Sequence, residues 1–360
     1  MKIQNKIPIL LPLFFLILGI TYQENIPGNF YFILIAIIFS FIFALNYKNN
    51  IPAYSLVFFS GALLLQNQKN ENLDIFKKIE NQNINVIASV LNKKNFKKQN
   101  IKEELVLKIK TIEKENQLEP INFNLICYTY TPTKILPGQQ IKIEDIKINN
   151  PNKTGARSDP FSYFLLKEKI LSSFFTKKLK YKILKENINP IKQAFYKIKN
   201  RIYEKIKLKL SPKAFNYFAS IFLGNKTETI SSEQRNIFNI WGVSHYLARS
   251  GLHIVIFIII WQLIFNLIPI PIKNKNVMLL IISIIYLALS WTSISFLRAF
   301  FVFILYQLSS LWEKQANFLH ILTIVCLIIL IKNPIQLFFL DFQLTFLLTF
   351  ALAISNKKIF

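Results

Sequence analysis

The sequence predicts a polytopic α-helical membrane protein with a small β-barrel domain inserted between two groups of membrane spans. Three observations support this fold class. The 360 residues are 52% hydrophobic, which is too apolar for an ordinary soluble enzyme. The apolar runs cluster at residues 7–66 and 211–355. The region between them holds most of the lysines and alternates apolar with polar residues, as half-buried strands do.

The net charge of +25 reflects 44 Lys and Arg against 19 Asp and Glu. Almost all of the basic residues are Lys, and the chain is also crowded with Ile and Asn, which is the bias of an AT-rich genome. Excess Lys is therefore weak evidence for a polyanionic partner. The few arginines carry more information, and Arg235, Arg249 and Arg298 lie in or beside the apolar C-terminal half.

The N-terminal apolar runs, residues 7–22, 30–47 and 51–66, are each close to the length that crosses a bilayer core of ~30 Å at ~1.5 Å per residue. Lys2 and Lys6 precede the first run, and no small-residue cleavage pattern follows it, so we expect an uncleaved anchor. Charges in the short loops place the N-terminus in the cytoplasm. Residues 1–66 should thus form three spans of the cytoplasmic (inner) membrane.

An odd number of crossings delivers residues 67–186 to the outer side. Here ELVLKIKTI at 104–112 and INFNLICYT at 121–129 alternate in polarity, and Pro, Gly and Asn separate such segments. These patterns predict short strands, and their number and spacing favour a small, partly closed β-barrel. Phe123 lies on the apolar face of its strand and is expected in the core.

The period becomes helical after Pro190, with apolar residues on one stripe and lysines among the polar partners. Residues 187–210 are therefore expected to form a basic amphipathic helix on a membrane surface. Packing of this helix on the barrel or on the helical bundle is an equally good interpretation, since amphipathicity does not choose between lipid and protein.

Residues 211–360 are expected to form a second helical membrane domain. Its most unusual stretch, residues 224–257, interrupts lipid-compatible sequence with a polar cluster: His245, Arg249, Ser250, Gly251 and His253. A charge at bilayer depth costs ~2.5–3.5 kcal/mol, so an Arg there should face a wet cavity, the interface or a partner. Either a water-lined path or a snorkelling Arg with helix-bridging histidines accounts for the cluster.

Two further polar clusters lie in the apolar half. SWTSISFLRAF at 290–300 contains Arg298, and LDFQLTFLLTF at 340–350 contains Gln343 beside Asp341, for which a helix N-cap is the better explanation. No catalytic residue is expected, because no carboxylate stands near the adjacent Ser244 and His245. Three histidines in the chain cannot build a dinuclear metal site, so we expect no metal, no other cofactor and no enzymatic activity.

These clusters resemble, in order and spacing, the membrane domain of the ComEC family of competence DNA-uptake channels. The resemblance is carried by five segments of the C-terminal half: FLGNK at 222–226, GVSHYLARSGLHI at 242–254, SFLRA at 295–299, NP at 333–334 and DFQLTF at 341–346. The polar region is similar to that family's OB-fold domain through LPGQQIKI at 136–143 and DPFSYFLLKEKI at 159–170. Arg249 and Asp341 depart from the family pattern.

The resemblance implies a channel that translocates single-stranded DNA into the cytoplasm during natural transformation. It also implies an extracytoplasmic OB-like domain, other competence-machinery proteins as partners, and a possible homo-oligomer. The DNA-path candidates lie in the three clusters: His245, Arg249, Ser250, Gly251, His253, Arg298 and Gln343. The aromatic residues that could stack on bases in the OB-like domain are Phe96, Tyr128 and Tyr130, although this domain could equally be structural.

Many family members continue into further spans and a metallo-β-lactamase-like domain, so we expect a shortened relative. The alternatives are a small-solute transporter, a membrane scaffold that transports nothing, or a decayed remnant of the DNA channel.

Overall fold

A computed structural model describes most of the chain. The described residues are 9–26, 31–38, 51–79, 83–95, 101–114, 117–148, 160–185, 190–224, 232–242, 251–290, 294–312 and 317–355. They fall into two compact units. A helical unit comprises Met1–Glu71 and Ala248–Phe360, and a sheet unit comprises Asn72–Leu247.

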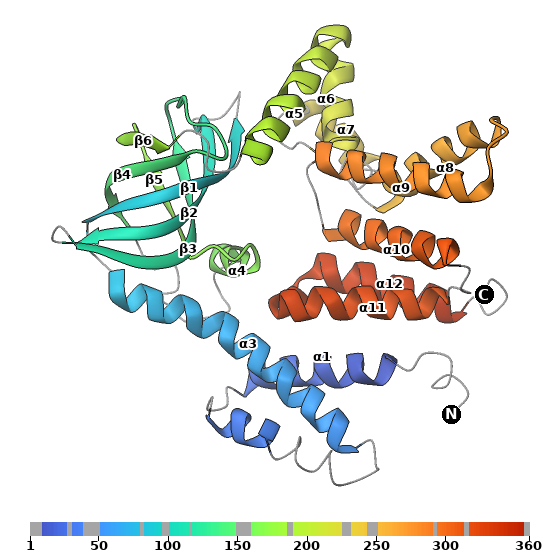
Figure 1. The fold of residues 1–360 in the computed structure, drawn as a ribbon, viewed down its shortest axis with the longest axis horizontal. Helices are drawn as coiled ribbons and strands as arrows, with labels where there is room; N and C mark the ends of the chain where they lie inside the picture. The colour runs from blue at the N-terminus through green and yellow to red at the C-terminus, as the bar shows by residue number, and fades with distance from the viewer. Residues whose placement is uncertain are drawn as a thin grey trace. The chain divides into compact units, whose positions relative to one another are not determined.

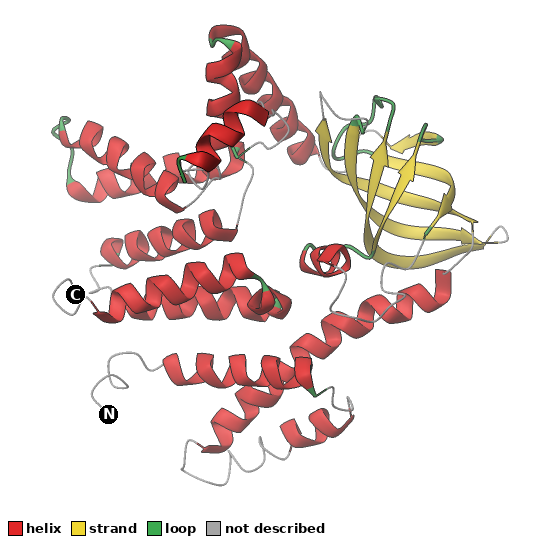
Figure 2. Cartoon of the chain, turned by 180° about the vertical axis from the view of Figure 1, so that it is seen from behind, coloured by secondary structure: helices red, strands yellow, loops and turns green. Residues whose placement is uncertain are grey.

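The sheet unit contains one six-stranded sheet in the order β5-β3-β2-β1-β4-β6 (Figures 1 and 2). All its pairings are antiparallel except that of β3 with β5, which is parallel. The strands are β1 (Asn83–Asn95), β2 (Glu103–Lys114), β3 (Gln117–Thr129), β4 (Gln140–Lys147), β5 (Ser172–Thr176) and β6 (Tyr181–Lys185). The predicted strands at 104–112 and 121–129 are therefore present.

Alternation of side chains along the strands builds the core of this sheet. Leu105 and Leu107 of β2 are fully buried opposite Cys127 and Leu125 of β3. Phe123 is buried in the same cluster, which confirms its expected place. Because side chains of a strand point to opposite faces in turn, every second residue of these strands is committed to the core.

The predicted small, partly closed β-barrel is confirmed only in part, because the sheet is present but does not close. β5 and β6 are its edges, and no ladder joins them. Four residues connect Thr176 to Tyr181, so the ends of the two edge strands lie within about 18 Å of each other. The sheet is thus strongly curled, as Figure 2 shows, but each edge strand is only five residues long. Strands this short leave a gap where a ladder would close the barrel.

Among its described residues, the sheet unit also contains the helices α4 to α7. α4 (Pro160–Lys167) covers part of the outer face of the sheet, where Leu165 packs with Ile126 of β3. α5 (Pro190–Lys209) and α6 (Pro212–Ile221) form a helical pair, and α7 (Ser232–Ile240) follows. The Ser211 hydroxyl accepts from the Ala214 backbone N–H and Pro212 begins α6, which is a standard helix start.

The N-terminal helices α1 (Leu10–Asn25) and α3 (Ile51–Ile79) pack at very short range, and residues 31–38 between them are also helical. A Cβ on Gly19 would lie 1.8 Å from the Phe58 carbonyl oxygen, so only glycine fits there. α3 continues past the predicted span end at residue 66, because Ile75 and Ile79, one turn apart, pack on the sheet core.

The C-terminal helices of the helical unit are α8 (Gly251–Asn266), α9 (Ile272–Leu289), α10 (Ile294–Leu311), α11 (Phe318–Lys332) and α12 (Leu340–Ser355), with the short 3-10 helix η2 (Pro334–Phe338) before the last. α10 contacts α8, α9, α11 and α12 and so forms the centre of this group (Figure 1). In the described part of the chain, α9 alone is long and apolar enough to cross a membrane, and the other four are shorter apolar helices. The number and direction of the crossings remain predictions.

Candidate functional site

Of the three arginines that the sequence places in or beside the apolar C-terminal half, Arg298 is the one whose side chain the structure describes. This side chain joins two helices. From α10, its Nη1 donates hydrogen bonds to the Thr345 carbonyl oxygen and the Thr349 hydroxyl of α12. Its guanidinium carbon also lies 5.7 Å from the centre of the Phe346 ring. Its Nε is buried without a hydrogen-bond partner among the described residues. The charge is thus held inside the helical unit rather than extended to its surface.

A cavity of about 680 Å³ opens beside Arg298, between α8, α10, α11 and α12. Most of its walls are aliphatic or aromatic side chains, and the polar side chains among its lining residues are those of Gln262, Ser295, Arg298, Tyr306 and Thr349. An apolar cavity with a few polar groups and one fixed cation is suited to an elongated or amphipathic solute that carries negative charge.

Gly251 lies in the same cavity wall, at the start of α8. A Cβ there would be 3.1 Å from the Ala299 Cβ and 3.6 Å from an Arg298 nitrogen. The backbone of α8 thus approaches α10 closely at Gly251, next to the guanidinium.

The other candidates for the DNA path lie elsewhere. His253 is buried in α8 but does not line the cavity. Gln343 of α12 donates to the Leu337 carbonyl oxygen at 2.8 Å, so it fixes the end of η2. His245, Arg249 and Ser250 fall outside the described residues.

Sequence reasoning missed Thr345 and Thr349. Their spacing of four residues on an apolar helix was the available signal, because it places two hydroxyls on one face. The Thr349 hydroxyl donates to the Thr345 carbonyl at 2.6 Å while it accepts from Arg298, so the two threonines act as one acceptor site.

A second candidate surface is the outer face of the sheet. Tyr128 of β3 stacks on Phe175 of β5, with ring centres 4.9 Å apart and planes 18° from parallel. Phe175 is 57% exposed and Tyr130 is 40% exposed, so aromatic faces reach solvent here. Burial, with the nearby Glu104 carboxylate, raises the pKa of Tyr128 to about 12. Phe96 lies outside the described residues.

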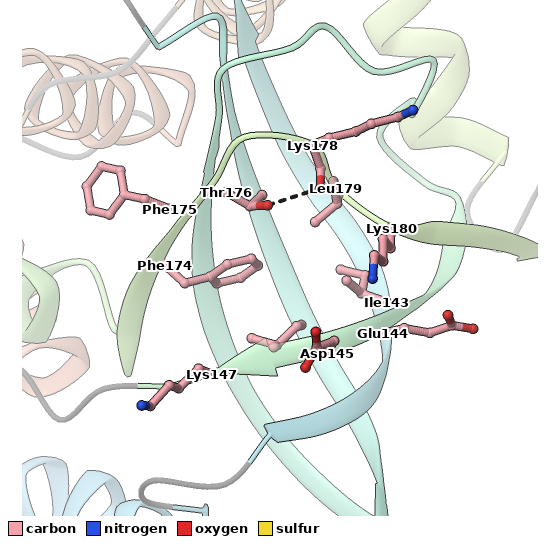
Figure 3. A pocket seen from close by; sticks show the side chains of 11 residues that line it. Ile143, Glu144, Asp145, Lys147, Phe174, Phe175, Thr176, Lys178, Leu179 and Lys180 are labelled. Carbon is pink, nitrogen blue, oxygen red and sulfur yellow. Dashed lines mark hydrogen bonds between the residues drawn. The ribbon is translucent and has the colours of Figure 1, made fainter.

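The gap between the sheet edges forms a groove of about 210 Å³, lined by β4 and by the segment from β5 to β6 (Figure 3). Phe174 turns its ring toward the groove, whereas Phe175 points to the opposite side of β5. Lys147, Lys178 and Lys180 line the groove, and so do Glu144 and Asp145, so its charge is mixed. Because the carboxylates in the groove repel a polyanion, the aromatic outer face of the sheet is the better candidate surface for binding one.

An apolar helical unit with a half-buried arginine is typical of a membrane-embedded domain, and residues 221–360 match the family model described as "Competence protein". This match to the C-terminal part of the chain supports a ComEC-family protein, and the competence domain of that family is a membrane domain, which is consistent with a membrane location. No curated protein and no solved structure matches this chain significantly.

Proposed function

We propose that this chain is an inner-membrane channel component that moves single-stranded DNA into the cytoplasm during natural transformation. The observation that carries the proposal is the match of residues 221–360 to the competence domain, which suggests a role in DNA uptake. In this proposal the N-terminus is cytoplasmic and the sheet unit lies on the outer side. Other competence proteins and further copies of the chain are its proposed partners.

Physical chemistry supports a role for Arg298 in such a path. A DNA strand carries one negative charge per nucleotide and cannot enter hydrocarbon, so its route needs donors and positive charge. Arg298 supplies a fixed cation at a cavity wall, and its Nε is buried with no partner in the described residues. A guanidinium held by Thr345 and Thr349 is already oriented before a phosphate arrives.

The test is DNA uptake in a strain that lacks the gene. The wild-type gene should restore uptake of labelled DNA, whereas the Arg298→Leu and Arg249→Leu variants should restore little of it. Arg298→Lys keeps the charge but loses the planar fork, so it should give an intermediate result. Equal amounts of each variant in the membrane fraction are the control. Full uptake by both leucine variants would remove these arginines from the path.

The outer face of the sheet is the proposed strand-holding surface. Base stacking on an aromatic residue contributes ~1–3 kcal/mol per base without sequence preference. Phe175→Ala should therefore weaken binding of single-stranded DNA to the purified full chain by about fivefold or more at low salt. Phe161→Ala on α4, also an exposed aromatic residue of the sheet unit, is the matched control. If wild type binds no DNA at low salt, this surface has a structural role instead.

One observation favours a second candidate, a small-solute transporter. The cavity of about 680 Å³ beside Arg298 falls within the size range of small-molecule sites, ~300–1,000 Å³, and its walls are mostly apolar. Deletion of the gene separates the two functions. Loss of transformation supports the DNA channel, and normal transformation with altered uptake of an anionic solute supports the transporter.

A further inference from the structure

The apolar stripe of α5 faces outward, away from the sheet unit that carries this helix. Ile191, Phe195, Ile198 and Ile202 follow one another at intervals of four, three and four residues, which places them on one face. They are 71%, 54%, 51% and 37% exposed. A helix that served only to cover a core would turn this face inward.

The polar face of α5 is the one that packs on the protein. Gln193 is buried, and the half-buried Tyr196 hydrogen-bonds Asn200 near the Glu103 carboxylate of β2. Further along the helix, Tyr203 packs edge to face on Phe215 of α6, with ring centres 5.0 Å apart. These contacts fix the orientation of α5, so its outward apolar face is built into the sheet unit.

The charge of α5 identifies what covers that face. The helix carries seven basic residues and one acidic residue, Glu204. Arg201 and Lys199 flank the apolar stripe on either side, and Lys205 and Lys209 continue its line toward the C-terminus. An apolar stripe bordered by basic residues is complementary to the interface of an anionic bilayer, where acyl chains lie beneath negative headgroups.

Protein partners from this chain fit the face less well. Among the described helices between residues 251 and 355, Asp341 is the only acidic residue, so they offer almost no charge to match the lysines. A second copy of α5 would bring another strongly basic surface and repel the first. We propose that α5 inserts its apolar face into an anionic membrane surface and thereby seats the sheet unit on the bilayer.

The test uses the full chain reconstituted in vesicles, with a fluorescent label at one introduced cysteine. Cys127 and Cys326, both buried, are replaced by alanine in the background. Ile202→Cys places the label on the apolar stripe, and Glu204→Cys places it on the opposite face of the same turn. In vesicles that contain phosphatidylglycerol, a quencher attached to lipid tails should remove most of the fluorescence at position 202 and little at 204.

A variant that lacks two positive charges tests the electrostatic contribution to the binding of α5 to the membrane. Lys199→Gln combined with Lys205→Gln should lower the ratio of inserted to free helix by about thirtyfold in anionic vesicles. Vesicles of phosphatidylcholine alone should give a larger loss, because they also remove the attraction for Arg201 and Lys209. Equal quenching at positions 202 and 204 would overturn the proposal. So would a label at 202 that is shielded from water but not reached by the lipid quencher, because that result means docking on protein.

Discussion

The Arg298 guanidinium of α10 donates a hydrogen bond to the Thr349 hydroxyl of α12, and that hydroxyl donates onward to the Thr345 carbonyl oxygen at 2.6 Å. A guanidinium cation inside an apolar unit is costly unless hydrogen-bond acceptors surround it. Here two threonines one helical turn apart supply the acceptors. The hydrogen bonds of the guanidinium therefore also join α10 to α12.

Removing the acceptor should therefore loosen the contact between α10 and α12. Thr349→Val keeps the shape of the side chain but deletes the hydroxyl, and a hydrogen bond to a charged group contributes ~1.5–3 kcal/mol. We expect a loss of stability of that size in thermal unfolding of the detergent-solubilised protein. Thr349→Ser retains the hydroxyl and should lose much less. Equal losses in the two variants would show that packing, not the hydrogen bond, determines the stability.

Gly19 sets the distance between α1 and α3. A side chain there would overlap the Phe58 backbone, and a Cβ on Gly61 would lie 2.5 Å from the Leu16 carbonyl oxygen. Gly19→Leu should push the helices apart and destabilise the helical unit by at least ~1–3 kcal/mol, the usual cost of overpacking. The measurement is the midpoint of thermal unfolding in detergent.

A matched control for Gly19→Leu is a change on the exposed face of the same helix. Leu18 is 38% exposed, so Leu18→Ala should shift the midpoint only slightly. A Gly19→Leu variant that unfolds at the wild-type temperature would mean that the two helices are not in contact.

The sheet could be predicted from the sequence largely because alternation is a local signal. Each of the segments 104–112 and 121–129 carries its own period of two, and Phe123 was placed in the core on that basis. Closure could not be predicted in the same way. It depends on the lengths of β5 and β6 and on pairing between strands distant in sequence, and no local period reports either.

The candidate site likewise contains residues that local sequence could single out and residues that it could not. Arg298 stood out because a charge is an anomaly within apolar sequence, and Gly251 stood out because it belongs to the polar cluster in residues 224–257. Thr349 and Phe175 did not, since a threonine in a membrane helix and a phenylalanine in a strand are ordinary residues. Their importance comes from the partners that the fold brings to them, Arg298 and Tyr128.

A buried ion pair holds the loop after β3 against the first two strands. Lys93 Nζ lies 2.9 Å from Glu103, and both side chains are at most 6% exposed. Lys93 also donates to the Thr133 carbonyl oxygen at 2.6 Å, and Glu103 accepts from the Thr133 hydroxyl at 2.6 Å. Lys93→Met should leave an unpaired buried carboxylate, which costs ~3–5 kcal/mol.

Hydrogen exchange in the full chain measures the effect of Lys93→Met locally. Amides of residues 130–139 should exchange faster in the variant, because the loop loses its anchor. The double change Lys93→Met with Glu103→Leu removes both charges and should restore part of the protection. If the double variant is less protected than the single one, the cost does not come from an unpaired charge.

Tyr128 should make the stability of the sheet unit fall at high pH. Burial and the Glu104 charge raise its pKa to about 12, from an ordinary value near 10. As pH rises from about 10 to about 12, the unfolded chain loses the phenolic proton first, so ionisation favours unfolding. This contribution to stability is complete below pH 10 and is lost as pH passes the folded-state pKa.

Denaturant unfolding of the full chain at a series of pH values measures this contribution of Tyr128. Tyr128→Phe should flatten the decline between pH 10 and 12, whereas Tyr130→Phe, at an exposed position of the same strand end, should keep the wild-type slope. An identical decline in all three proteins would assign it to other groups, such as the lysines.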